Sequence, residues 1–580
     1  MIMKTNSSRH TVRTSRAHWI LSAYAGLALI AAGNLQAANV PTIWDVTDGD
    51  WLTAGNWSAG LPADLAPADL SQALFNVTAN SPETSNVTLN GVGTFDYLGV
   101  GLGKTVNLEL GDGASLTGKT IIVGRFVAGT VVSSHLNVTG PATGQANLTW
   151  SSGFQLGGVA TGLGDTATFS GPNLTITDTA ANLTVGRQGN GHTLTIKDGV
   201  KYSGKAMIVS ATVNVTSGVG NNHKLVVSGT GTEVSLGGQT GSTATLGLIV
   251  GSRPLTGSSS SNVQSGNAVE ISNGARMTVV GDNPDATMTV LVGASTYRVN
   301  NSIQVAGANS VLDLKGDIAT TIGHTTDTSY NNRLVVNNGG TIRSEGVINI
   351  NNGTSIAANR RNILDVGSLG TLLTSNAINN NGGLVRLNEG GVLRGETSFG
   401  ASTAVALNIN GTGRFEAAGS GLGSTVAVNV GNGASQAVLA VGITGRTFAA
   451  TWTVDSAISM NNNSALEVSI FGSHSIDSII LGENSSFTIG ENVTLSIGLR
   501  NHVLQAGDSY QLFSGEFDHV IGNFSTISTP TLAGDLSWDL SGFNADGGWT
   551  VAVIPEPSSM VLLFGGGAVA MMLRRMRSKR

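Results

Sequence analysis

Acidic and histidine side chains are the groups in this chain whose types suit catalysis. Glycan hydrolysis needs two or three carboxylates that converge at a fixed separation, and lyase chemistry needs an acidic calcium-binding cluster beside an Arg or Lys base. The acidic residues are instead scattered, as at Asp112, Asp198 and Asp313. Asp282 and Asp285 flank an Asn-Pro pair and suit either a bound cation or a turn with two solvated carboxylates, and the turn is the simpler interpretation.

The histidines are equally dispersed, and none belongs to a His-Glu-x-x-His arrangement. They stand singly at His135, His192, His223, His324, His474, His502 and His519. His192 and His324 each follow a glycine and precede a threonine, so we expect both in polar corners. Glycine-rich runs such as Gly101-Leu102-Gly103-Lys104 arise by chance in a chain with 80 glycines. The sequence predicts no catalytic residue, metal site, nucleotide site or cofactor.

The carboxyl-terminal residues form a three-part pattern. Pro555-Glu556-Pro557 comes first, an apolar run follows from Met560 to Leu573, and Arg574, Arg575 and Arg577 begin a basic end. Clustered cations stay on the cytoplasmic side of a membrane, so the pattern predicts a transmembrane helix with its end inside the cell and the body outside. The run is short for a full span of about 20 residues.

This tail resembles the PEP-CTERM sorting signal of Gram-negative bacteria that make exopolysaccharide. The resemblance covers about the last thirty residues, here 553–580. It implies that an exosortase, a membrane protease-transpeptidase, recognises Pro555, Glu556 and Pro557 and removes the anchor, so that the protein is held only transiently in the inner membrane. The alternative is a permanent anchor preceded by a chance Pro-Glu-Pro.

The amino-terminal residues indicate export. Four cations between Lys4 and Arg16 precede an uncharged apolar stretch from Trp19 to Ala32, and Leu35-Gln36-Ala37 supplies the small residue that signal peptidase requires. We therefore expect residues 1–37 to be a signal peptide cut between Ala37 and Ala38. An uncleaved anchor is the alternative.

Composition limits the class of the exported body. The chain has 580 residues, no cysteine, 11% charged residues and a net charge of −6. Without disulfides, stability must come from a large buried surface or from repeated backbone pairing. Basic clusters are absent outside the two ends, which argues against a nucleic-acid partner.

The interior repeats one phrase: an alternating strand, a turn with Gly and Asn or Asp, and another alternating strand. Examples are residues 108–116, 194–200, 269–277, 334–342, 385–393 and 407–415. Alternation turns one side of each strand inward, and Asn-Gly or Asp-Gly supplies the positive φ of a tight corner. The phrase also suits a local hairpin, but further short strands such as 120–124 and 207–210 join the copies.

We therefore predict an all-β fold, a right-handed parallel β-helix (solenoid) with a capping β-element at each end. The expected boundaries are an amino-terminal cap at 38–99, the repeat body at 100–450 and a carboxyl-terminal β cap at 451–552. Fifteen to twenty coils at about 4.8 Å each would give a rod of about 70 to 100 Å. Asn-rich steps at Asn337-Asn338, Asn351-Asn352 and 379–381 suit either stacked amide ladders at corners or solvated loops.

Segments with aromatic residues flank the body on both sides, at Ile43-Trp44-Asp45, Gly55-Asn56-Trp57-Ser58, residues 507–513 and Trp549-Thr550-Val551. These flanks resemble those of exported passenger proteins with autotransporter-associated strand repeats. The chain has no carboxyl-terminal membrane barrel of the kind found in that family, so self-transport is not expected. The resemblances imply a non-catalytic structural or adhesive protein of the cell surface or exopolysaccharide matrix. A β-helix polysaccharide lyase or glycoside hydrolase is the alternative.

Overall fold

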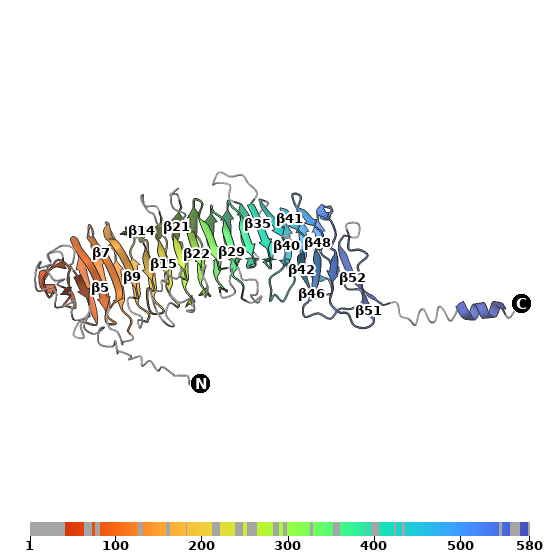
Figure 1. Cartoon of the computed structure of the whole chain (residues 1–580), viewed down its shortest axis with the longest axis horizontal. Coiled ribbons are helices and arrows are strands. Elements are labelled where there is room, and N and C mark those ends of the chain that lie inside the picture. The colour runs from red at the N-terminus through yellow and green to blue at the C-terminus, as the bar shows by residue number, and fades with distance from the viewer. Residues whose placement is uncertain are drawn as a thin grey trace, which may run out of the picture.

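The computed structural model describes residues 41–62, 72–75, 82–125, 132–157, 163–180, 182–210, 221–237, 247–251, 264–281, 289–293, 298–324, 329–351, 360–388, 390–395, 405–422, 425–431, 436–544, 548–556 and 569–577. The fold is all-β, with two long sheets of parallel strands wound into a rod (Figure 1). Each coil contributes three short strands, and each strand pairs with its equivalents in the coils before and after.

The three faces of the rod are named here by the strands that form them. Face 1 contains β2 (Asp48–Asp50), β4 (Thr84–Leu89), β6 (Thr105–Leu110), β8 (His135–Thr139), β10 (Thr166–Ser170), β13 (Thr193–Lys197), β16 (Lys224–Ser228), β20 (Ala268–Ser272), β24 (Ser302–Ala306), β27 (Arg333–Asn337), β30 (Ile363–Val366), β33 (Leu384–Leu387), β36 (Arg414–Ala417), β39 (Ala437–Val441), β42 (Ser464–Gly472), β46 (Thr494–Leu499) and β50 (Thr526–Ser528).

Faces 2 and 3 belong to one sheet, joined near the amino terminus by the long strands β5 (Val92–Gly101), β7 (Ser115–Arg125) and β9 (Ala146–Leu156). Face 2 continues through β11 (Leu174–Asp178), β14 (Lys201–Gly204), β17 (Glu233–Leu236), β21 (Arg276–Val280), β25 (Val311–Lys315), β28 (Thr341–Ser344), β31 (Thr371–Thr374), β34 (Val392–Gly395), β37 (Gly419–Leu422), β40 (Thr451–Val454), β44 (Ser478–Leu481) and β48 (Phe513–Gly515).

Face 3 contains β1 (Pro41–Ile43), β3 (Gln72–Phe75), β12 (Leu183–Val185), β15 (Met207–Val209), β18 (Leu248–Val250), β22 (Thr289–Val292), β26 (Ala319–Ile322), β29 (Ile348–Asn351), β32 (Ile378–Asn381), β35 (Val405–Asn410), β38 (Val426–Val430), β41 (Ala457–Met460), β45 (Ser486–Ile489) and β49 (Val520–Ile521). Short additional elements are β19 (Gln264–Ser265), β23 (Arg298–Val299), β43 (Ser475–Ile476), η1 (Ala54–Asn56) and η5 (Phe517–His519).

The alternation of apolar and polar residues along the strands corresponds to an alternation of buried and partly exposed side chains. In β24, Ile303 and Val305 are buried while the residues between and beside them are partly exposed. The inward side chains of successive coils merge into one hydrophobic core that runs through the rod. Because each apolar layer is covered only by its neighbours in the stack, this core forms only when coils pile upon one another.

The corners use the expected turn chemistry. Asn273-Gly274 and Asn338-Gly339 have positive φ at both residues, 55° and 81° in the first pair and 52° and 85° in the second. The strands on either side of such a corner lie on different faces, as β20 and β21 do, and each pairs in parallel with another coil. The hairpin interpretation of the repeated phrase is therefore wrong.

In the described part of the chain, seventeen face-1 strands follow one another in parallel register from β2 to β50. Twelve of them, β6 to β39, lie between residues 100 and 450, fewer than predicted for that range. Coils vary in length because corners carry loops: 44 residues separate His223 from Asn267, whereas 21 separate Asn86 from Asn107. The stack extends past both expected boundaries of the repeat body.

Aromatic side chains fill the amino-terminal end of the rod. Trp44, Trp51, Trp57 and Phe75 are buried. The ring centroids of Trp44 and Trp51 each lie 5.0 Å from that of Trp57 in edge-on geometry. The Trp57 Nε1–H donates to the Trp51 carbonyl at 2.9 Å. This cluster covers the apolar layer that the first coil would otherwise leave open.

At the other end the strand direction changes. β47 (Ser509–Gln511), β52 (Thr550–Pro555) and β51 (Leu536–Asp539) form a three-stranded antiparallel sheet with β52 in the middle. Trp549 is buried against Phe513 and Phe543, with centroids 5.5 and 5.2 Å away. The sheet and this cluster close the last coils, and Figure 1 shows β51 and β52 at the carboxyl end of the rod.

Of the expected membrane segment, the structure describes only residues from 569 onward, and 569–577 are helical. None of the helices in the described ranges combines the length and apolarity that crossing a bilayer requires. The expected signal peptide, 1–37, lies outside the described residues.

Candidate functional site

The residues of the expected sorting motif adjoin the terminal sheet. Pro555 is the last residue of β52, opposite Leu536, and the Glu556 N–H donates to the Asp535 carbonyl at 2.8 Å. The motif therefore begins where the folded body ends, with no spacer between them. Pro557, Ala37 and Ala38 lie outside the described residues.

The expected membrane-stop cations lie on the helix at 569–577. Arg574, Arg575 and Arg577 are exposed there. Their side chains share that helix with exposed apolar residues, among them Met572 and Leu573.

The three scattered aspartates do not converge. Asp112 and Asp198 are exposed at separate corners. Asp313 is buried in β25 and pairs with Arg276, whose Nη2 lies 3.0 Å from its Oδ2. Asp282 and Asp285 lie outside the described residues.

Two histidines that are far apart in the sequence meet inside the rod. The His192 and His223 rings stack with centroids 5.0 Å apart and planes 4° apart, and neither residue is exposed. His192 does occupy a corner, as expected, but the corner is sealed from solvent. The sequence analysis did not predict this contact. The signal that could have predicted it is the position of the two histidines, because each immediately precedes a face-1 strand.

Both histidines belong to a buried row of polar residues that we name the corner spine. Each member immediately precedes a face-1 strand and is buried, and the row comprises Ser134, Asp165, His192, His223, Asn267, Asn301, Asn332 and Asn362. From Ser134 to Asn332, every backbone N–H donates to the side chain of the next member, at 2.7 to 3.3 Å.

The asparagine part of the spine is doubly bonded. The Asn301 N–H and Nδ2 both donate to the Asn332 Oδ1, at 3.2 and 2.9 Å. The Asn332 N–H and Nδ2 do the same to the Asn362 Oδ1, at 3.0 and 2.9 Å. A buried N–H group without an acceptor costs free energy. The corner spine supplies acceptors for the buried N–H groups at this corner, so we assign it a structural role.

A second set of ladders lies on the outer surface of face 3. Nδ2 of Asn379, Asn408 and Asn429 donates to Oδ1 of the preceding member of the row, which begins at Asn349, at 3.0 to 3.1 Å. We name these four residues the amide row. Asn381 donates to Asn351 at 3.1 Å in a parallel row. The ladder interpretation is confirmed for these residues, although the amides lie within strands and not at corners; Asn352 is not described.

The outer surface of face 1 carries an ion-pair network between β30 and β42, here called the arginine network. Arg386 Nε and Arg414 Nε each lie 3.0 Å from a different oxygen of Glu416. Arg414 Nη1 also lies 2.6 Å from Glu467 Oε2, and Arg386 Nη1 lies 3.9 Å from Asp365 Oδ2. Asp365 and Glu416 are therefore paired with Arg386 on an adjacent strand, and Glu467 is paired with Arg414 across the intervening strand β39.

Their protonation follows from these contacts. Burial alone would raise the pKa of Glu416, but the hydrogen bond from the Thr444 hydroxyl, at 2.5 Å, and the two arginines together lower it. Burial raises the pKa of Asp365, with Arg386 opposing. A carboxylate held by two guanidinium groups is a poor proton acceptor, so the network is suited to holding strands and not to acid–base catalysis.

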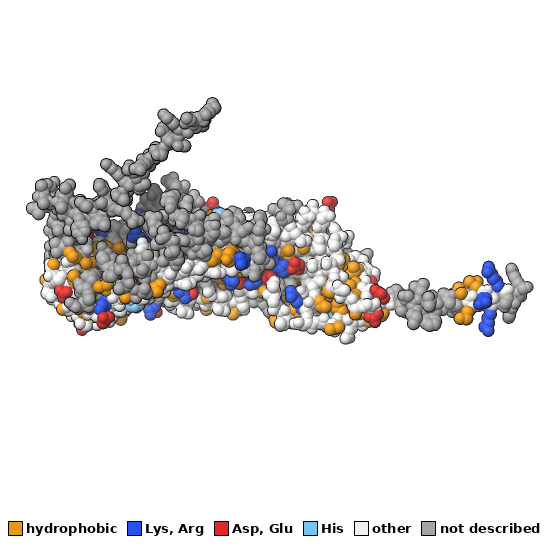
Figure 2. All heavy atoms as spheres, turned by 60° about the horizontal axis from the view of Figure 1, so that its bottom comes forward, with side chains coloured by type: hydrophobic (Ala, Val, Ile, Leu, Met, Phe, Trp, Pro, Cys, Tyr) orange, Lys and Arg blue, Asp and Glu red, His pale blue; other side chains and the backbone are white. Residues whose placement is uncertain are grey.

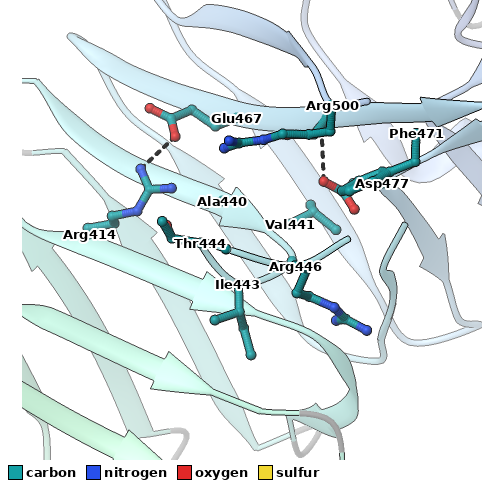
Figure 3. Close-up of a pocket in the computed structure, with 13 residues that line it drawn as sticks. Arg414, Ala440, Val441, Ile443, Thr444, Arg446, Glu467, Phe471, Asp477 and Arg500 are labelled. Carbon is teal, nitrogen blue, oxygen red and sulfur yellow. Dashed lines mark hydrogen bonds and ion pairs between the residues drawn. The ribbon is translucent and has the colours of Figure 1, made fainter. Parts of the chain in front are cut away.

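A loop at residues 442–450 rises over this network and separates two hollows. One has a volume of about 390 Å³, part of it open solvent, and its lining includes the charged residues Arg414, Glu467, Asp477 and Arg500. In Figure 3 the Arg414 guanidinium points to Glu467, while Arg446 points away from that pair. We name this the charged hollow.

Asp477 holds the end of the loop in place. Its Oδ1 accepts the Ala450 N–H at 2.7 Å and its Oδ2 accepts the Ser469 N–H at 2.9 Å. Burial raises the pKa of Asp477 to about 6, against these hydrogen bonds and the charges of Arg446 and Arg500. Both oxygens are occupied by backbone donors, which favours a clamping role over catalysis.

The second hollow is open and shallow, and lies on the other side of the loop. Its lining includes Ser368, Asn388, Thr444, Arg446 and Phe448, and its volume is about 1100 Å³, part of it solvent. Phe448 is 58% exposed, and the Arg446 guanidinium carbon lies 4.3 Å from its ring centroid. We name this the open hollow.

Exposed charge elsewhere is mixed. Figure 2 shows basic and acidic side chains interspersed with apolar and uncharged ones on the described part of the visible face. Within the described residues, Glu516, Asp518 and His519 bring their ligand atoms within 4.8 Å of one another, but the two acids are exposed and nothing else marks a metal site.

Comparison with known proteins gives little support for any assignment. No family model matches the chain, and no curated protein matches it. A crystal structure of a hyper-glycosylated fragment of TibA, whose glycosylation TibC catalyses, matches 77% of this chain and 100% of its own at 12% identity and a TM-score of 0.19. A score that low carries no argument about this protein.

Proposed function

We propose that the protein is an exported, non-catalytic structural or adhesive rod of the cell surface or exopolysaccharide matrix, and that an exosortase sorts it after signal peptidase has acted. The proposal includes a right-handed winding of the β-helix. The proposed role is argued from the surface of the rod and from the position of the tail.

The observation that carries the proposal is a long uncharged polar strip on face 3. In seven consecutive coils one outward register holds only hydroxyl or amide side chains, in the order Thr321, Asn349, Asn379, Asn408, Asn429, Ser459 and Thr488. At about 4.8 Å per coil, the strip is about 29 Å long. Such a strip offers hydrogen bonds along its length but no group that could move a proton.

A polysaccharide lyase or glycoside hydrolase is the second candidate, and the charged hollow is the observation in its favour. Asp477, with its pKa near 6, would be the acid or base. Its oxygens, however, already accept the Ala450 and Ser469 N–H groups, and Glu467 is paired with Arg414. Turnover assays on acidic and neutral polysaccharides decide between the two: reducing ends or an unsaturated product, lost in Asp477→Asn, would refute the non-catalytic role.

The sorting proposal predicts a defined mature product. Intact-mass measurement of protein released to the cell surface should give a chain that begins at Ala38 and lacks the residues after the Pro-Glu-Pro element. Replacing Pro555, Glu556 and Pro557 together by alanine should leave the full carboxyl terminus attached and the protein in the inner membrane. A surface form whose mass includes Arg574 to Arg580 would show that the tail is a permanent anchor.

A further inference from the structure

We propose that the amide row on face 3 is a binding surface for a neutral, extended polysaccharide, which lies along the rod with one sugar unit to each coil. The inference rests on the proposed function, because it names the class of glycan that the rod would hold. Three properties of face 3 support it: the hydrogen-bonding capacity of the amides, the small size of the side chains beside them and the uncharged character of the surrounding rows.

The amides keep part of their hydrogen-bonding capacity for a ligand. A side-chain amide has two N–H donors and an oxygen with two acceptor positions. Asn379 and Asn408 each donate one N–H to the amide oxygen of the preceding coil and accept one from the amide of the following coil, at 3.0 to 3.1 Å. The ladder therefore uses one donor and one acceptor position of each residue and leaves the others. Both side chains are partly exposed.

The ladder also orders these groups before a ligand arrives. Each inner amide is held by bonds to the coils on both sides, so it has little side-chain freedom to lose on binding. The row runs along the rod through β29 and β35, which Figure 1 labels. It presents one donor and one acceptor at each coil, about 4.8 Å apart. Hydroxyl groups recur at a similar interval along an extended β-linked sugar chain, so such a chain can bond to successive coils.

Small side chains beside the amide row leave it open to a flat ligand. The residues two positions before its four members lie on the same outer side of face 3, because side chains alternate along a strand. They are partly exposed, and they are Val347, Ala377, Ala406 and Ala427. Side chains of this size do not reach over the neighbouring amides. Their methyl groups offer apolar contacts to the C–H groups of a sugar ring, beside the polar contacts that fix its position.

Face 1 carries a similar ladder with different neighbours. The Asn107 Nδ2 donates to Asn86 Oδ1 at 2.7 Å, and the Asn137 Nδ2 donates to Asn107 Oδ1 at 2.9 Å. His135 stands two residues before Asn137, and Glu109 stands two residues after Asn107. Long and charged side chains therefore flank this ladder, and a flat neutral polymer cannot lie against it as it can on face 3. The face-1 ladder is thus a matched control for the amide row.

The rows on face 3 select a neutral polymer. The strip from Thr321 to Thr488 holds hydroxyl or amide side chains in each of its coils. Beside it, Asn381 donates to Asn351 at 3.1 Å and accepts from Asn410 at 3.5 Å. A polymer of uronate units would lose hydration of its carboxylates here and gain no cation from these rows. Neutral hydroxyls instead exchange hydrogen bonds to water for hydrogen bonds to amides.

The test is calorimetric titration of the full mature chain with cellohexaose and with β-mannohexaose, two neutral hexasaccharides with extended backbones. Maltohexaose has the same glucose units as cellohexaose, but its α-linked chain coils. We expect at least one extended hexasaccharide to bind, maltohexaose to bind at least about fivefold more weakly, and the disaccharide of the bound sugar to bind at least about tenfold more weakly, because it reaches fewer coils. The affinity should not change with salt, because no charges meet.

Variants locate the surface. Asn408→Ala removes a donor and an acceptor from the middle of the amide row and should weaken binding of the extended hexasaccharide about fivefold or more. Ala406→Lys keeps every amide and places a long side chain beside the row, so it should weaken binding by at least a similar factor even where Asn408→Ala proves unstable. Asn137→Ala in the face-1 ladder and Ala306→Lys at a partly exposed position of β24 are the matched controls, and both should bind as the unaltered protein does.

The proposal is overturned if neither extended hexasaccharide binds, if maltohexaose binds equally well, or if both face-3 variants behave like their controls. Pull-down of the full chain with the producing cell's own exopolysaccharide separates this result from the wider one. Retention by that polymer with no effect of the face-3 variants refutes the binding surface alone, whereas a rod that binds neither the polymer nor the cell surface refutes the proposed function itself.

Discussion

Asn332→Ala tests the idea that the corner spine stabilises the rod from within. The substitution removes the oxygen that accepts both the N–H and the Nδ2 of Asn301, and both donors belong to a fully buried residue. A buried donor left unpaired costs about 1 to 3 kcal/mol, so we expect the free energy of unfolding to fall by about 4 kcal/mol. The Nδ2 bonds of Asn332 to Asn362 and to the Arg298 carbonyl are lost as well.

The matched control is Asn379→Ala in the amide row. Asn379 also bridges two coils through its amide, but it is partly exposed, so water can satisfy its former partners. We expect a loss below about 1 kcal/mol. Guanidinium unfolding followed by circular dichroism gives the global value. Because stacked repeats can open locally, hydrogen exchange at the Asn301 amide gives the local one. Equal losses in the two variants, or unchanged exchange at Asn301, would refute the reasoning.

Two further predictions concern acid sensitivity and close packing. Burial, and then the charge of His192, lower the pKa of His223 to about 3. Below pH 6.5 the unfolded chain therefore binds a proton at this residue that the folded chain does not bind, and the free energy of unfolding decreases as the pH falls. Between pH 7 and pH 5 this lowers the free energy of unfolding by about 2 kcal/mol. His223→Asn, which places at this position the residue type of Asn267 in the next coil, should reduce that pH-dependent loss by about the same amount, as measured by guanidinium unfolding at the two pH values. Identical losses in the variant and the unaltered protein would contradict the prediction. Gly346→Ala places a Cβ 2.1 Å from the Ile318 carbonyl oxygen, whereas Gly534→Ala meets nothing within 4 Å. We expect Gly346→Ala to lower the free energy of unfolding by about 1 to 3 kcal/mol and Gly534→Ala to lower it by less than about 0.5 kcal/mol. Equal melting temperatures of the two variants would show that the backbone adjusts at residue 346.

The sequence predicts the stacked strands because alternation and Asn-Gly corners are local properties, visible within nine residues at 269–277. It does not predict which residues meet across coils. His192 and His223 are 31 residues apart, and the loop lengths that set this spacing follow no fixed period. Phe448 and Arg446 are close in sequence, but their exposure at a hollow depends on Asp477 and Glu416, which reach the loop from other coils. The amide ladders were recognisable from composition, yet their place on face 3 required the register.

The corner spine also bears on how the length of such a rod can change. Asn267, Asn301 and Asn332 each accept a hydrogen bond from the coil before and donate to the coil after, and Asn362 accepts from Asn332 in the same way. Any one of these coils could thus be duplicated or lost as a whole, and the new neighbours would still present matching partners. Recombination within the gene can then lengthen or shorten the reach of the protein in steps of one coil while both ends stay closed.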